Sequence, residues 1–208
     1  MSLAILESGA RSLGLDLSAE QVGRFERYMA LLLEWNSRFN LTRITSPDEV
    51  ETKHFLDSLT VVRALNSEAG FPDGFTVLDV GSGAGFPGIP LKIALPGLAV
   101  TLLEATGKKV AFLNHAVAAL ELVGTNIVQG RAEERAHEEA LRELFQAVVA
   151  RAVAPLSTLC EFGLPFVHIG GLFIAFKKGD TAREIGEASN AIARLGGALE
   201  SRTTADMT

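Results

Sequence analysis

Apolar side chains recur at helical spacing through the first third of the chain, where no strand pattern is found. Ser18 is a predicted N-cap, and Gln21 three residues later completes a capping box for a helix that runs to about residue 38. A second helix-start signal, with proline and two acids at 46–49, predicts one helix or a pair of short helices over 48–65. The apolar positions of the first helix are Val22, Phe25, Met29, Leu32 and Leu33.

Beyond the glycine- and proline-containing segment 70–74, short apolar runs alternate with helical segments. This alternation predicts an α/β fold with a mostly parallel sheet and helices on both faces. We expect residues 1–70 to form a helical extension that packs on an α/β domain of residues 71–208. The expected strands cover 76–80, 99–103, 126–129, 145–150, 171–176 and 198–203, and the expected helices cover 87–94, 108–122, 133–144, 155–166 and 181–195.

The composition is that of a folded chain with an acidic balance. The 208 residues hold 19 Lys and Arg against 25 Asp and Glu, which gives a net charge of −6. This charge excludes a protein that binds nucleic acid over a uniformly basic surface. Only a local basic site for nucleic acid is compatible with it. Glu7 interrupts the apolar run that a signal peptide needs, and the uncharged segment 162–176 is too short for a membrane span. We therefore expect a cytoplasmic protein with no membrane partner.

The single cysteine, Cys160, excludes an internal disulfide and a cysteine-only zinc site. It lies among apolar residues of an expected helix, which is typical of an inert core cysteine rather than of a reactive thiolate. We expect no metal.

Four glycines follow the first expected strand, in the run from Val77 to Gly88. Glycines at the first β-to-α turn let a ligand approach the backbone closely, and the N–H groups of the next helix then face that ligand. A P-loop is excluded because it needs Gly-Lys-Ser/Thr, and the first lysine after these glycines is Lys92. A dinucleotide-binding turn, a cofactor turn of another kind and a purely structural glycine-rich turn remain.

Asp79 distinguishes these alternatives, because it stands two residues ahead of the alternating glycines Gly81, Gly83 and Gly85. This pattern resembles the first motif of the S-adenosylmethionine-dependent methyltransferases. A carboxylate stabilises a ligand that carries an ammonium and a sulfonium, whereas it repels a pyrophosphate. The motif therefore favours S-adenosyl-L-methionine over a dinucleotide.

Two further acids follow the next strands. Glu104 ends the second strand and has the geometry to accept hydrogen bonds from both ribose hydroxyls, as in other nucleotide sites. Glu133 follows the third strand, where it either faces the N6 amine of an adenine or acts as a first-turn acid of a helix. Neither acid separates a dinucleotide from S-adenosylmethionine, because both ligands contain adenosine.

Taken together, these blocks resemble the glucose-inhibited division protein B family, the guanine-N7 methyltransferases of bacterial small-subunit (16S) ribosomal RNA. The resemblance covers about residues 32–197 and implies a Rossmann-like class I methyltransferase fold. It is carried by Trp35-Asn36 with Asn40-Leu41-Thr42; Lys53-His54-Phe55-Leu56-Asp57-Ser58; Asp79 to Leu91; Leu103-Glu104 with Lys108-Lys109-Val110; Gly130 to Glu134; Ala150-Arg151-Ala152; and Lys177-Lys178-Gly179.

The resemblance also implies roles for individual residues. Gly81 and Phe86 would lie against the cofactor, and Arg151 would sit at the mouth of its site. Glu104 stands where many family members have aspartate, so the longer arm shifts the ribose slightly. The remaining implied cofactor contacts are Ala105 and Thr106 beside the ribose and Ala132 and Glu133 beside the adenine.

The resemblance names guanine N7 as the acceptor, and the residues permit it because the loops that other acceptors need are missing. The sequence after the fourth strand lacks the Asn/Asp-Pro-Pro-aromatic loop of amine methylation, and Cys160 does not fit a thiolate for carbon methylation. Guanine N7 is an unprotonated nitrogen with an exposed lone pair, so its methylation needs no general base. Arg151 and Lys177 are the candidates for holding the base or a phosphate.

An RNA substrate needs a path of positively charged side chains on the protein surface. The resemblance implies that the partner is small-subunit ribosomal RNA or a ribosomal particle. We expect the protein to be a monomer. His54 and Asp57 are either a site pair or a structural hydrogen bond. A methyltransferase of another substrate class, or a nucleotide-binding regulatory module without catalysis, stays open, and a dehydrogenase leaves Asp79 unexplained. The candidate RNA contacts are Asn40, Arg43, Lys53, His54, Lys108 and Lys109.

The family usually continues beyond the position of Thr208 into a final strand and a basic tail. We therefore expect the C-terminal strands of this sheet to be incomplete.

Overall fold

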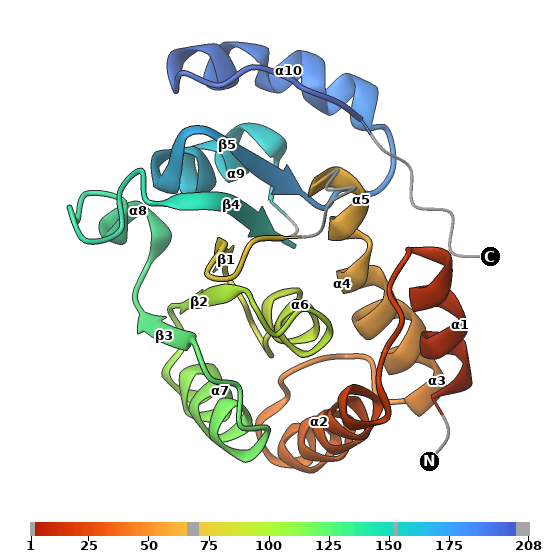
Figure 1. Cartoon of the computed structure of the whole chain (residues 1–208). Coiled ribbons are helices and arrows are strands. Elements are labelled where there is room, and N and C mark those ends of the chain that lie inside the picture. The colour runs from red at the N-terminus through yellow and green to blue at the C-terminus, as the bar shows by residue number, and fades with distance from the viewer. Residues whose placement is uncertain (1–2, 66–70, 152–153, 203–208) are drawn as a thin grey trace.

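The centre of the computed structural model is a parallel sheet of five strands (Figure 1). The model describes residues 3–65, 71–151 and 154–202. The strands lie in the order β3-β2-β1-β4-β5, and each neighbouring pair is parallel. Because the order reverses between β1 and β4, a ligand crevice is expected at the carboxyl ends of these strands. The strands are β1 (Thr76–Val80), β2 (Ala99–Glu104), β3 (Thr125–Gln129), β4 (Phe145–Ala150) and β5 (Val167–Ala175).

Helices cover both faces of the sheet, as the alternation of the sequence predicts. On one face α6 (Gly88–Ala94) and α7 (Gly107–Ala119) pack against β1, β2 and β3. On the other face lie α8 (Ala132–Arg135) and α9 (Leu156–Gly163), which is followed by the single 3₁₀ turn η2 (Leu164–Phe166). The last helix, α10 (Thr181–Arg194), packs on α9 (Figure 1).

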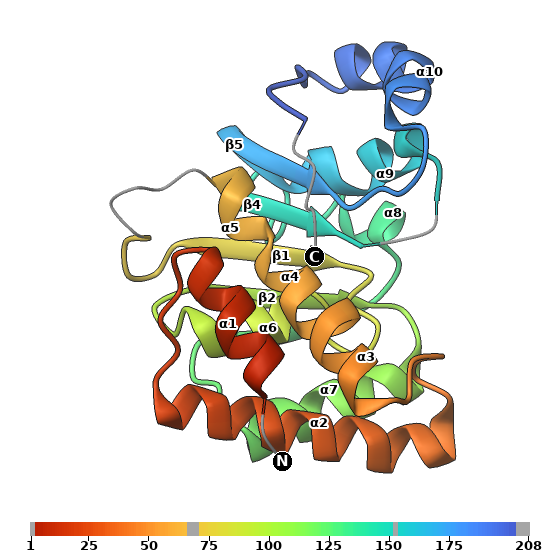
Figure 2. The same cartoon turned by 90° about the vertical axis from the view of Figure 1, so that its right-hand side faces the viewer.

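In the described part of the chain, six helical segments precede the sheet (Figures 1 and 2). Of these, α2 and α4 pack on α6, α2 also contacts α7, α1 packs on η1, and α5 lies against β5. The capping box of Ser18 and Gln21 is present, as predicted. The segments are α1 (Ala4–Ser12), α2 (Ala19–Phe39), α3 (Pro47–Val50), the π-helix η1 (Glu51–Leu56), α4 (Asp57–Leu59) and α5 (Val61–Leu65). Among the described residues, no helix is both long and apolar enough to cross a membrane.

The N-terminal helices and the sheet share one hydrophobic core. Phe25 and Leu32 of α2 belong to the same buried cluster as Val77 of β1 and Leu91 of α6. The Gln21 amide adds a polar link, because its Nε2 donates to the carbonyl oxygens of Ile93 and Ala94 at 2.9 and 2.8 Å. These carbonyls lie in the last turn of α6, where the helix itself supplies no donor.

The structure corrects the prediction of a helix over 133–144. Only Ala132–Arg135 is helical, and turns follow up to residue 143. Of residues 137–144, none is buried, so a longer helix would have no apolar stripe to pack.

Two strand predictions also need correction. β5 begins at Val167 rather than at residue 171, because a register shift against β4 accommodates Gly170 and Gly171. Residues 198–202 form no strand, and residue 203 lies outside the described part of the chain. The expected division at residue 70 also falls outside it and stays a prediction.

Candidate functional site

The glycine turn between β1 and α6 is at the carboxyl end of the central strand. Gly81, Gly83 and Gly85 have φ values of 72°, 62° and 96°, which L side chains rarely adopt. A Cβ on Gly81 would have no heavy atom within 4 Å, and one on Gly83 would meet only a backbone oxygen at 3.9 Å. A Cβ on Gly85 would instead lie 2.5 Å from a side-chain carbon of Ile89. The first two glycines therefore leave backbone open to a ligand, whereas the third permits internal packing.

Asp79 lies beneath this turn and is fully buried. Its Oδ2 accepts a hydrogen bond from the N–H of Gly88 at 2.8 Å, at the start of α6. Its Oδ1 is buried and has no partner among the described residues. Burial raises the pKa of Asp79 from 3.8 to about 7, although the Gly88 hydrogen bond opposes this shift. This unpartnered oxygen is suited to a ligand that carries positive charge.

Glu104 ends β2 and is also buried. One carboxylate oxygen accepts from the N–H of Gly83 at 2.9 Å, and the other accepts from the N–H of Thr106 at 2.8 Å. Lys109 places its ammonium 3.8 Å from the same group. Ala105 and Thr106 are exposed beside it, and their place at a ribose stays a prediction.

The predicted adenine residues follow β3, the neighbour of β2. Ala132 is buried at the start of α8, and the exposed Glu133 lies 3.5 Å from Arg131 in an ion pair. The parallel pairing brings the ends of β1, β2 and β3 to one edge of the sheet. The candidate cofactor residues thus lie along three successive strand ends.

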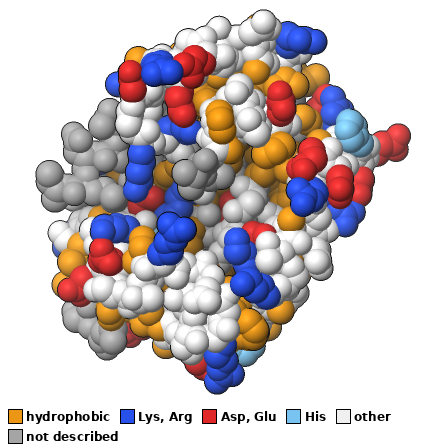
Figure 3. Space-filling view, turned by 180° about the vertical axis from the view of Figure 1, so that it is seen from behind, with side chains coloured by type: hydrophobic (Ala, Val, Ile, Leu, Met, Phe, Trp, Pro, Cys, Tyr) orange, Lys and Arg blue, Asp and Glu red, His pale blue; other side chains and the backbone are white. Residues whose placement is uncertain are grey.

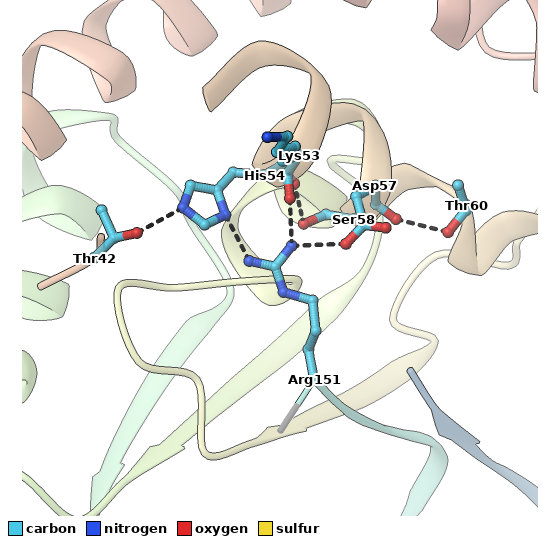
Figure 4. A network of polar contacts seen from close by, with 7 residues as sticks. All are labelled: Thr42, Lys53, His54, Asp57, Ser58, Thr60 and Arg151. Carbon is cyan, nitrogen blue, oxygen red and sulfur yellow. Dashed lines mark hydrogen bonds and ion pairs between the residues drawn. The ribbon is translucent and has the colours of Figure 1, made fainter. Parts of the chain in front are cut away.

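Arg151 follows β4 and meets the N-terminal helices across the glycine turn (Figure 4). Its Nη1 donates to the carbonyl oxygen of Lys53 at 3.1 Å and to the carboxylate of Asp57 at 2.9 Å. Its Nη2 is 2.7 Å from Nδ1 of His54. The guanidinium carbon also lies 5.1 Å from the ring centre of Phe86. His54 and Asp57 therefore meet through Arg151, and no bond between the two was found.

His54 is the inner residue of this network. Its ring stacks on Phe86 with 4.2 Å between ring centres and 12° between planes. Its Nε2 is 2.8 Å from Oγ1 of Thr42. Burial and then the positive charge of Arg151 lower the pKa of His54 from 6.5 to about 4, so the ring is neutral near pH 7. The structure thus gives His54 protein partners rather than an open surface.

The other candidate RNA residues differ in whether their side chains form ion pairs. Asn40, Arg43 and Lys108 are exposed, and Asn40 has a positive φ of 50° at the end of α2. Lys53 pairs with Glu49, and Lys109 faces Glu104 in the cofactor site.

The strands run toward the face seen in Figure 3, as Figure 2 shows. On this face, Lys and Arg side chains lie on several sides of a central hollow, with acidic side chains between them (Figure 3). The positive charge on this face is therefore local, and the RNA path over it stays a prediction.

Lys177 does not lie free at the site. Its ammonium donates to the carbonyl oxygen of Ala154 at 2.7 Å and pairs with Glu184 of α10 at 2.9 Å. The interaction with Glu184 leaves less of its charge for a substrate. Cys160 is buried, as predicted, and burial raises its pKa. In the described part of the chain, no cluster of three or more metal-ligating side chains occurs.

Sequence reasoning missed two residues that support the site, one at the glycine turn and one at the loop that carries Thr42. The hydroxyl of Tyr28 donates to the carbonyl oxygen of Ala84, and its ring contacts Phe55 and Phe86. Asn36 is buried and accepts from the N–H of Thr42 at 2.8 Å, which fixes the loop that presents Thr42 to His54. Tyr28 looks like an ordinary apolar position of α2, so no sequence signal marked it, whereas Asn36 stood in a family block.

The strand order, the open glycine turn and the acid at the end of β2 together define a Rossmann-like class I methyltransferase fold. A solved S-adenosylmethionine-dependent methyltransferase from Aquifex aeolicus has this fold, at 18% identity and a TM-score of 0.51, covering 76% of this chain and 86% of that one. The TYW2 protein of M. jannaschii, solved in complex with AdoMet, matches at 16% identity and a TM-score of 0.50 over 60% of this chain and 57% of that one.

The sequence comparisons are more specific. The family model described as rRNA small subunit methyltransferase G matches residues 21–206. A relative from Lachnoclostridium phytofermentans is 48% identical over 94% of this chain and 79% of its own length. One from Roseiflexus castenholzii is 50% identical over 90% of this chain and 78% of its own length, and both are named Ribosomal RNA small subunit methyltransferase G. The chain belongs to this family.

Proposed function

We propose that the protein transfers a methyl group from S-adenosyl-L-methionine to N7 of a guanine in bacterial 16S ribosomal RNA. The observation that carries the proposal is the unpartnered buried oxygen of Asp79 beneath the open backbone of Gly81 and Gly83. An ammonium group satisfies such an oxygen, whereas a pyrophosphate is repelled by it. Bound S-adenosylmethionine supplies a methyl group activated on its sulfonium, and S-adenosylhomocysteine is the product.

The remaining cofactor residues fit the same ligand. Each carboxylate oxygen of Glu104 accepts one backbone N–H and keeps a lone pair for a ribose hydroxyl. In the proposed arrangement the residues after β3 border the adenine, and those around Arg151 close the other end of the site. The proposed cofactor contacts are Asp79, Gly81, Gly83, Gly85, Phe86, Glu104, Ala105, Thr106, Ala132, Glu133 and Arg151.

The site also suits an acceptor that gives up no proton before it reacts. His54 has both ring nitrogens in hydrogen bonds, so it is not available as a general base. Guanine N7 attacks the methyl group with its own lone pair, and catalysis then consists of positioning and exclusion of water. The guanine leaves its stack to reach the hollow at the strand ends.

The proposal includes an RNA path over exposed cations, with Arg43 and Lys108 as the foremost candidates. Since the net charge is −6, we propose that a structured ribosomal particle rather than a bare strand supplies much of the recognition. We propose that the protein acts as a monomer in the bacterial cytoplasm, where ribosomes are assembled.

The test uses tritium-labelled S-adenosylmethionine with small ribosomal subunits and their extracted RNA. We expect label in the 16S RNA and chain cleavage at the labelled guanine after borohydride and aniline treatment, which cuts at N7-methylguanosine. Labelled RNA that resists cleavage would exclude N7. Label confined to proteins or small molecules would establish another substrate class, and binding without transfer would establish a regulatory module.

A further inference from the structure

Arg151 is held by one short segment of the N-terminal helices. The carbonyl oxygen of Lys53, Nδ1 of His54 and the carboxylate of Asp57 all accept its N–H groups. Lys53 and His54 lie in the π-helix η1, and Asp57 follows it at the start of α4. A π-turn is rare and frequently marks a functional position. Here it brings three acceptors within reach of one guanidinium.

The protonation state of His54 follows from its partners. An arginine side chain has five N–H donors and no acceptor, so Nδ1 of His54 must carry a lone pair. The proton of the neutral ring is then on Nε2 and is donated to Oγ1 of Thr42. Thr42 Oγ1 also accepts from the N–H of Ile44 at 3.1 Å, which keeps this oxygen in place as an acceptor.

The stack on Phe86 fixes the plane in which His54 presents its lone pair. Phe86 follows the glycine turn directly, and the guanidinium carbon of Arg151 is 5.1 Å from the same ring centre. A displacement of the imidazole would therefore change the position of the guanidinium relative to the turn. Asp57 and the Lys53 carbonyl bond only to Nη1, so His54 supplies the hydrogen bond to Nη2.

We infer that His54 is a positioning residue, whose neutral imidazole orients Arg151 for methyl transfer instead of contacting RNA. Three hydrogen bonds to Arg151 are satisfied, and its Nε–H and one Nη2–H have no partner in the described part of the chain. These donors match a carboxylate, or O6 of guanine, which leaves the N7 lone pair free to react. The inference deepens the proposed function and rests on it for the identity of the reaction.

Three substitutions of His54 distinguish the contribution of the Nδ1 hydrogen bond from that of the Nε2 hydrogen bond. In His54→Asn the amide oxygen stands near the position of Nδ1 and accepts from Arg151. In His54→Gln it reaches toward the position of Nε2, and in His54→Phe the stack on Phe86 remains without any acceptor. We expect Asn to recover most of the methyl transfer, whereas Gln and Phe lose roughly tenfold or more, the scale of one hydrogen bond to a charged group.

A double-mutant cycle that combines His54→Phe with Arg151→Ala tests whether His54 acts through Arg151. We expect His54→Phe to have little further effect in the Arg151→Ala background. An equal loss in both backgrounds would overturn the inference, as would a His54→Asn protein that is as inactive as His54→Phe at the same thermal midpoint. The control is His168→Phe, an exposed histidine at the opposite edge of the sheet.

Two measurements identify what Arg151 faces. Loss of S-adenosylmethionine affinity in His54→Phe, measured by calorimetry, identifies the cofactor carboxylate as the acceptor. Loss of kcat at saturating cofactor with unchanged affinity identifies the guanine. If neither quantity changes, His54 does not position Arg151.

Nuclear magnetic resonance of the ring nitrogens tests the arrangement without any assay of activity. We expect a neutral His54 with its proton on Nε2 near pH 7. A proton on Nδ1 would overturn the inference even in an active enzyme. If the wild-type protein methylates no ribosomal RNA, the proposed function fails, while this spectrum still decides the relation between His54 and Arg151.

Discussion

The carboxylate of Glu104 accepts a hydrogen bond from the N–H of Gly83 at 2.9 Å, so one side chain links the ends of β2 and β1. The same carboxylate also accepts from Thr106 at the start of α7. Glu104 is therefore both a proposed ligand of the ribose and a structural part of the turn that receives the rest of the cofactor.

Replacement of Glu104 by alanine tests both roles. We expect the affinity for S-adenosylmethionine to fall by roughly 1.5–3 kcal/mol, the scale of hydrogen bonds to a charged group, as measured by calorimetry. The free energy of unfolding in urea should also fall, because the backbone N–H groups of Gly83 and Thr106 lose their acceptor. Glu104→Gln, which keeps one acceptor oxygen, should give an intermediate affinity. Wild-type affinity in Glu104→Ala would contradict the ribose role.

Alanine substitutions at two neighbouring glycines should have different effects. Gly83→Ala places a methyl group in open space, so it should weaken cofactor binding while unfolding remains cooperative, with a conformational cost of about 1–2 kcal/mol. Gly85→Ala directs its methyl group at Ile89 and the hydroxyl of Tyr28 and should destabilise the fold by more. Thermal unfolding and calorimetry compare the two variants, and equal losses of stability would argue against this distinction.

The raised pKa of Asp79 predicts a pH dependence of stability. The folded protein holds a proton between about pH 4 and 7 that the unfolded chain has released, so the free energy of unfolding should fall as the pH rises through this range. Asp79→Asn should remove this slope, which urea unfolding at several pH values would reveal. An unchanged slope in the variant would assign it to another group.

The same residue predicts a pH dependence of binding with the opposite sign. A cationic ligand stabilises the ionised carboxylate, so the affinity for S-adenosylmethionine should rise as the pH approaches and passes 7. Calorimetry in buffers of different ionisation enthalpy should detect proton release below this pH. In Asp79→Asn the release should disappear and the binding should be weaker.

Tyr28→Phe tests the contribution of the N-terminal helices to the site. The ring keeps its contacts, but the carbonyl oxygen of Ala84 loses its donor, at a cost of about 1–3 kcal/mol in unfolding free energy. Because Ala84 lies between Gly83 and Gly85, cofactor affinity should fall as well. Ser37→Ala removes an exposed hydroxyl from the same helix and serves as the control, which should behave like wild type.

The sheet and the cofactor turn were predictable because their signals are local. The alternation of apolar runs with helical segments predicted the strands. Asp79 and the glycines of 81–85 lie within a few residues of one another at the end of one strand. Glu104 was predictable for the same reason, since strand ends of a parallel sheet meet at one edge.

The surroundings of Arg151 were not predictable, because Arg151 and His54 lie far apart in the sequence and meet only through tertiary packing. The helix expected over 133–144 failed for a related reason. Its charged residues have good helical propensity, but the fold gives them no surface against which to pack.

The packing of α2 on α6 and α7 has a consequence for how the chain is made. The apolar face of α2, with Phe25, Tyr28 and Leu32, is complete about 80 residues before the end of α7 has been synthesised. At roughly 5–20 residues per second, this face waits for several seconds without the helices that cover it. Until α6 and α7 emerge, this apolar face lacks part of its native cover, and transiently exposed surface of this kind is prone to aggregation.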